Sequence, residues 1–122
     1  MTEPVVHWRA TLRNQLLTAR KTRDTVRTAA LRSALAAIDN AETPDVELPR
    51  AGAIADSANG LGAAEVPRRH LSEADIRAVL EAEIAERRTA ARTLQAAGHT
   101  DRAGQVDAEA AVLCGLLPVG PL

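Results

Sequence analysis

The stretch LSEADIRAVLEAEIAERRTAARTLQAAG (71–98) decides the fold, because it indicates one uninterrupted helix with a signal at each end. Ser72 can cap the amino end, and Asp75, three residues later, can reach back to the free backbone donors. Gly98 accepts the left-handed conformation that ends many helices. The segment therefore predicts a helix near 72–97, in which roughly 24 helical residues at ~1.5 Å each give a length of about 36 Å. Its apolar positions recur at helical spacing: Ile76, Leu80, Ile84, Ala91 and Leu94.

Three other segments show the same periodicity and predict helices near 3–19, 23–41 and 101–116. The joint between the first two spans only residues 20–23, so these helices should fold back as an antiparallel pair. The chain holds 26 Ala, one Trp and no Phe or Tyr, which suits closely packed helices better than a sheet. The sequence therefore predicts an all-α fold, a small helical bundle of about four helices arranged as two helical hairpins.

The helical pattern breaks between residues 43 and 69, where proline and glycine recur. This composition predicts a long flexible loop at 43–69. With 122 residues, the chain is expected to form one domain over 1–118, followed by an apolar tail over 119–122. The carboxyl-terminal end is apolar enough to favour a weak homo-oligomer unless it folds back on the domain. Its apolar residues are Leu116, Leu117, Val119 and Leu122.

Composition points away from several functional classes. The single cysteine, Cys114, excludes an intramolecular disulfide, and its apolar neighbours favour a small buried side chain over a nucleophile. Neither a metal site nor a cofactor is expected, because none of the three histidines pairs at helical spacing and no phosphate-binding motif is present. No signal sequence and no long apolar run appear, which predicts a cytoplasmic protein without a membrane segment.

Charge is distributed unevenly along the chain. The net charge is −1, yet residues 1–40 hold seven basic and three acidic side chains, giving +4, and the remainder gives −5. Phosphates of a nucleic acid would suit the amino-terminal half, although the two halves could equally attract each other within one bundle. The candidate RNA-binding residues are Arg9, Arg13, Arg20, Lys21, Arg23 and Arg27, and an antiparallel helix pair could align them. A merely solvated basic face is the alternative.

Four motifs resemble the YqeY-like family, small helical proteins related to the tail of the B subunit of glutamine-dependent tRNA amidotransferases. These motifs are RTAALRSALAAI (27–38), VLEAEIAERR (79–88), AAG (96–98) with Asp101 and Arg102 after it, and LCGLLP (113–118). The residues that carry the resemblance are Arg27, Leu31, Arg32, Glu83, Arg87, Arg88, Gly98, Arg102, Glu109 and Pro118. Two features depart from the family: Leu116 replaces an aromatic residue, and the second small helical domain of the family is expected to be absent.

The resemblance implies a non-catalytic module that associates with tRNA or with an amidotransferase subunit. Larger relatives form carbon–nitrogen bonds with glutamine as the amide donor, but other domains and subunits perform that chemistry. The residues themselves offer no catalytic set: Glu83, Glu86 and Arg87 are interpreted as a surface ion-pair ladder. A protein-interaction or scaffold bundle without nucleic acid is the second hypothesis, which the nearly neutral net charge favours.

Overall fold

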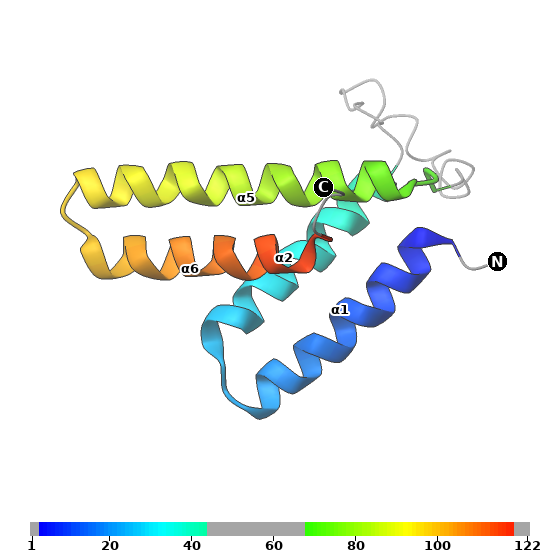
Figure 1. The fold of residues 1–122 in the computed structure, drawn as a ribbon, viewed down its shortest axis with the longest axis horizontal. Helices are drawn as coiled ribbons and strands as arrows, with labels where there is room; N and C mark the ends of the chain where they lie inside the picture. The colour runs from blue at the N-terminus through cyan, green and yellow to red at the C-terminus, as the bar shows by residue number, and fades with distance from the viewer. Residues whose placement is uncertain (1–2, 44–67, 119–122) are drawn as a thin grey trace, which may run out of the picture.

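Four helices make up the part of the chain that the computed structural model describes, residues 3–43 and 68–118. They are α1 (Pro4–Lys21), α2 (Thr25–Glu42), α5 (Glu73–Ala96) and α6 (Thr100–Leu116), and the described ranges hold no strand (Figure 1). The predicted all-α fold is confirmed, and each predicted helix boundary lies within about two residues of the observed one. The predicted flexible loop falls almost wholly on 44–67, and the predicted tail on 119–122, both outside the described residues.

Both ends of α5 have the predicted chemistry. The Ser72 hydroxyl accepts from the Asp75 backbone N–H at 3.0 Å, and the Asp75 carboxylate accepts from the Ser72 N–H at 2.9 Å. At the other end Gly98 has a φ of +89°, and the His99 N–H donates to the Leu94 carbonyl at 2.8 Å. This is the usual glycine-ended helix stop, so the sequence alone identified both ends of the longest helix.

The turn between α1 and α2 uses the same stop without a glycine. Arg23 takes a φ of +59°, and the Asp24 N–H donates to the Ala19 carbonyl at 2.9 Å. Asp24 then caps α2, its carboxylate accepting from the Arg27 backbone N–H at 3.0 Å. A side chain in this left-handed region is strained, so a non-glycine residue there is noteworthy.

The helices form two hairpins that cross at an angle (Figure 1). Helix α6, with 17 residues, runs antiparallel beside the longer α5, with 24 residues, and α1 and α2 form the second pair. Helix α2 packs against all three other helices, whereas α1 packs chiefly on α2 and meets α5 over a short region. This arrangement leaves one side of α1 facing α6 without close helix packing.

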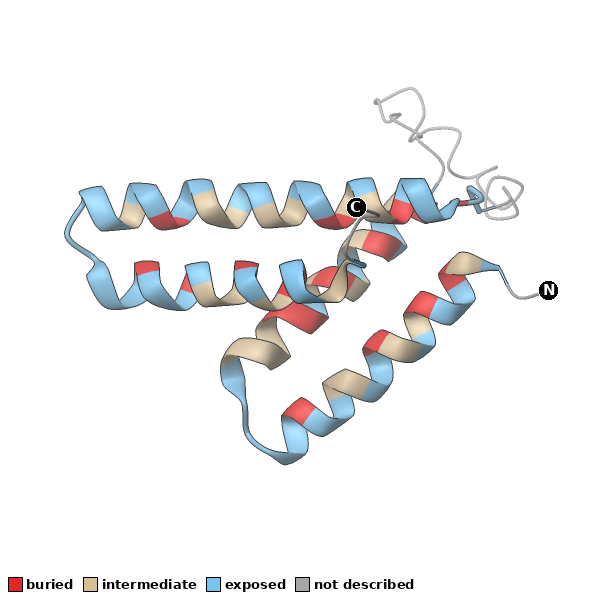
Figure 2. Cartoon of the chain, in the orientation of Figure 1, coloured by how far each residue is buried: buried red, intermediate tan, exposed pale blue. Residues whose placement is uncertain are grey.

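All four helices contribute side chains to the core, and α2 lies at the centre of the core. Buried residues lie on the faces of α5 and α6 that turn toward each other, and on the inner side of α1 (Figure 2). The largest fully buried side chains are Leu12, Leu31, Ile38, Ile76, Leu80 and Leu113. Trp8 is 9% exposed, and its indole N–H donates to the Glu73 carboxylate at 3.1 Å. That bond ties the first hairpin to the start of the second.

The prediction that Cys114 is a small buried side chain is wrong, because Cys114 is exposed. The buried stripe of α6 runs through Ala103, Val106, Ala110 and Leu113. Cys114 follows Leu113 directly and so lies about 100° further round the helix. Leu116 and Leu117 are partly buried and pack against the core, while Val119 and Leu122 lie outside the described residues.

Candidate functional site

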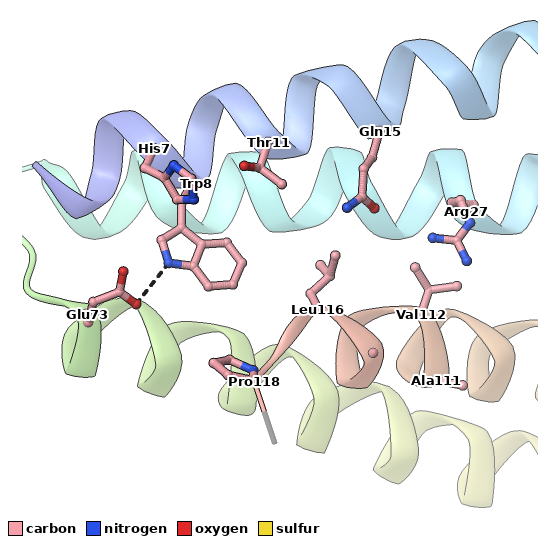
Figure 3. A pocket seen from close by; sticks show the side chains of 11 residues that line it. His7, Trp8, Thr11, Gln15, Arg27, Glu73, Ala111, Val112, Leu116 and Pro118 are labelled. Atoms are coloured by element: carbon pink, nitrogen blue, oxygen red, sulfur yellow. Dashed lines mark hydrogen bonds between the residues drawn. The ribbon is translucent and has the colours of Figure 1, made fainter. Parts of the chain in front are cut away.

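The six predicted RNA-binding residues occupy three separate places on the first hairpin. Arg9 and Arg13 line a hollow at the open end of the hairpin, where Arg68 and Arg69 also lie. Arg20, Lys21 and Arg23 are at the bend between α1 and α2. Arg27 lines a groove on the side of the hairpin that faces α6 (Figure 3). The single stripe suggested by the helix spacing is therefore divided.

Arg9 is engaged with two carboxylates. Its Nη2 lies 2.6 Å from Asp39 Oδ1 and 2.6 Å from Glu42 Oε1. The hydrogen bond that Arg9 donates to Glu42, together with the one that it donates to Asp39, raises the pKa of Arg9 above its ordinary value despite partial burial. Glu42 also accepts from Arg68 at 3.1 Å. Two positive charges, those of Arg9 and Arg68, thus lie against one buried carboxylate. Arg9 is held in ion pairs within the protein in this arrangement.

Four exposed cations lie at the bend between α1 and α2 and in the first half of α2, and we call this set the basic bend: Arg20, Lys21, Arg23 and Arg32. All four are exposed, and none lies within ion-pair distance of a carboxylate among the described residues. Arg20, Arg23 and Arg32 line one hollow together with the hydroxyl-bearing Thr25 and Thr28. Guanidinium and hydroxyl groups are donors for phosphate oxygens, so this hollow can accept an anion.

Arg27 differs from its neighbours at the bend. Its guanidinium lies 3.8 Å from the Asp24 carboxylate, a long ion pair between side chains that are each more than two-fifths exposed. It points into the groove between α1 and α6, which encloses about 560 Å³. We call this the α1–α6 groove. Trp8, Val112 and Leu116 supply its apolar surface, and Glu73 lies at the end opposite Arg27 (Figure 3).

Several residues that carry the YqeY-like resemblance meet between α5 and α6. The Arg87 guanidinium reaches Glu83 at 2.7 Å and Glu109 at 3.3 Å, and the three side chains are between 14 and 21% exposed. Arg88 pairs with Asp107 at 2.9 Å. The Glu83–Arg87 ion pair of the expected ladder is present, but the expected surface position is wrong: Arg87 is largely buried and joins two helices, because it faces α6.

The remaining residues of that resemblance have varied positions. Leu31 is fully buried in the core, and Gly98 ends α5. Arg32 belongs to the basic bend, and Pro118 follows α6 and borders the α1–α6 groove. Arg102 is exposed and donates to the Gln105 side chain at 3.3 Å. Most of the shared residues therefore serve helix packing or helix ends.

Metal chemistry finds no support within residues 3–43 and 68–118, where no three His, Cys, Asp or Glu side chains could hold an ion together. His70 lies beside a single carboxylate, with its Nδ1 3.3 Å from Glu3 Oε1. The predicted absence of a metal or cofactor stays a prediction. No helix in these ranges is long and apolar enough to cross a membrane.

Glu42 is the notable residue outside the site residues predicted from the sequence. Its side chain is 8% exposed, the most buried charge among the ion pairs of the described residues. A signal was present, because Glu42 lies one helical turn after Ile38 and continues the apolar stripe of α2. A carboxylate on such a stripe indicates a buried charge that needs cationic partners.

Comparison of the chain with protein-family models, with curated proteins and with solved structures gives no match. The resemblance to the YqeY-like family therefore rests on the motifs quoted above.

Proposed function

We propose that this protein is a non-catalytic helical module that contacts tRNA through phosphates at the basic bend. The observation that carries the proposal is the hollow between Arg20, Arg23 and Arg32, whose guanidinium groups have no carboxylate within ion-pair distance among the described residues. An Arg guanidinium binds phosphate oxygens in a planar, two-pronged geometry, and Thr25 and Thr28 add hydroxyl donors. Contacts of this kind recognise the backbone and not the base sequence.

The resemblance to the YqeY-like family supports tRNA as the class of nucleic acid, because the related tail belongs to tRNA amidotransferases. The geometry narrows the candidate contacts. Arg9 is held by Asp39 and Glu42, so we assign it a role in stabilising the fold and not in binding phosphate. Arg20, Lys21, Arg23 and Arg32 are the residues that we expect to touch phosphates.

The salt dependence of binding to labelled bulk tRNA tests this proposal. Each phosphate contact contributes about 0.7–0.9 to the slope of log affinity against log salt, so three or four contacts give a slope of about −2 to −4. The Arg20→Ala/Arg32→Ala variant should lose about 1.4–1.8 of that slope. Fluorescence anisotropy between 50 and 200 mM KCl, a range of about fourfold typical for such titrations, measures it.

A matched control removes the same charge elsewhere. Arg92 and Arg102 are exposed residues near the α5–α6 turn, at the far end of the second hairpin. The Arg92→Ala/Arg102→Ala variant should keep the wild-type slope. Binding that ignores salt, equal loss in both double variants, or no binding in low salt would refute the tRNA proposal.

An interaction module without nucleic acid is the second candidate. The α1–α6 groove favours it, because this partly apolar groove is lined by other residues than the hollow of the basic bend. Loss of tRNA binding in the test above would leave this candidate in place.

A further inference from the structure

The α1–α6 groove exists because α1 packs on α2 and does not close against α6. Residues His7, Trp8, Thr11 and Gln15 of α1 form one wall, and α6 forms the other (Figure 3). From His7 to Gln15 the wall advances by eight residue steps, about 12 Å at ~1.5 Å per step. The groove therefore has the length of roughly two turns of a helix.

The α6 wall is built from residues that let another chain come close. Ala111 and Gly115 lie one turn apart and are both exposed. A Cβ placed on Gly115 would meet nothing within 4 Å, so the space in front of it is open. Between these small residues and α1, the indole of Trp8 and the side chains of Val112 and Leu116 offer an apolar floor.

Charge at the two ends gives the groove a direction. Glu73 lies at one end, where one carboxylate oxygen already accepts from Trp8. Arg27 lies at the other end (Figure 3). A helix carries roughly half a positive charge at its amino end and half a negative charge at its carboxyl end. A helix that lies in the groove with its amino end at Glu73 and its carboxyl end at Arg27 would place each of its end charges beside a side chain of opposite charge.

We propose that the α1–α6 groove binds an amphipathic helix of a partner protein, with the amino end of that helix at Glu73. The partner should present large apolar residues at helical positions i, i+4 and i+7, which would pack on Trp8, Val112 and Leu116. A helix suits the site better than an extended strand, because both walls are helices and the described residues offer no sheet edge. The inference goes beyond tRNA binding and does not depend on it.

A displayed library of 14-residue helical peptides tests the proposal on the full chain. The peptides lack Trp and Tyr and vary the apolar face among Leu, Ile, Met, Phe and Ala. Selection uses the wild-type protein, and Trp8, the only aromatic residue of the chain, then reports binding by its fluorescence. Two Gly→Leu variants of α6 complete the design, since neither Gly104 nor Gly115 has any atom within 4 Å of an added Cβ.

We expect selected peptides to bind the wild type and Gly104→Leu equally, and to bind Gly115→Leu at least tenfold more weakly. Circular dichroism checks that both variants keep their helix content. A quencher on the amino end of the peptide should quench Trp8 more strongly than one on the carboxyl end, because Trp8 lies beside Glu73. Both variants should bind tRNA like the wild type, so failure here is separate from failure of the tRNA proposal.

Three results would overturn the inference. The first is a selection in which no peptide distinguishes Gly115→Leu from Gly104→Leu. The second is stronger quenching from the carboxyl end of the peptide, which would contradict the assigned direction. The third is a wild-type dimer in sedimentation velocity that Gly115→Leu abolishes, because the groove would then hold a second copy of this chain.

Discussion

Glu42 carries a buried negative charge at the carboxyl end of α2, where the helix dipole is itself negative. Arg9 from α1 and Arg68, just before α5, compensate this charge. The Arg69 N–H also donates to the Glu42 carbonyl at 2.6 Å. One residue thus connects the end of α2 to α1 and to the segment that leads into α5.

Replacement of Glu42 tests how much this connection stabilises the fold. Glu42 and Asp39 both lie 2.6 Å from the same nitrogen of Arg9, but their side chains are 8% and 54% exposed. Glu42→Gln should lower the free energy of unfolding by about 1–2 kcal/mol, because a partly buried charged hydrogen bond is lost. Asp39→Asn should cost at most about 1 kcal/mol, because solvent screens the exposed pair. Urea unfolding compares them, and equal losses would show that burial does not decide the effect.

At the scale of one element, α5 shows what a sequence can predict. Its start depends on Ser72 and Asp75 and its end on Gly98, all local contacts within a few residues along the chain. The partners that Arg9 and Arg87 find on other helices could not be predicted in this way. Asp39 is 30 residues from Arg9, and Glu109 is 22 residues from Arg87, so only the packing of whole helices brings them together.

The capping box of α5 also makes stability depend on pH. Hydrogen bonds from the Ser72 backbone and hydroxyl lower the pKa of Asp75, with smaller help from His70 and Arg69. A carboxylate whose pKa is lowered by folding stabilises the native state above its unfolded pKa, and this contribution is lost as pH falls through the folded pKa. The stability difference between wild type and Asp75→Asn should therefore shrink below about pH 4. Urea midpoints at pH 7, 5, 4 and 3, values that bracket the aspartate titration, would check this, and a constant difference would contradict it.

At the scale of the whole molecule, two hairpins cross with α2 in the centre. The apolar stripes predicted the four helices and their pairing into hairpins. They did not predict the crossing angle, because an apolar stripe shows which face is buried and not which helix covers it. For the same reason, the sequence did not predict that the basic residues would lie in separate places. Their spacing along α1 and α2 shows which helix face they occupy, but only the packing against α6 places Arg27 in the groove.

The position of Trp8 allows a test of whether the two hairpins unfold together. Trp8 is buried in the core on α1 and bonded to Glu73 at the start of α5, so its fluorescence reports the junction of the hairpins. The core is shared by all four helices, and Leu31 and Ile38 of the central α2 are fully buried. We therefore expect one cooperative transition, in which Trp8 fluorescence and far-ultraviolet circular dichroism give the same urea midpoint and slope. A fluorescence midpoint well below the dichroism midpoint would instead mean that α1 leaves the second hairpin before the rest of the core unfolds, and that the Trp8–Glu73 contact is a weak point of the fold.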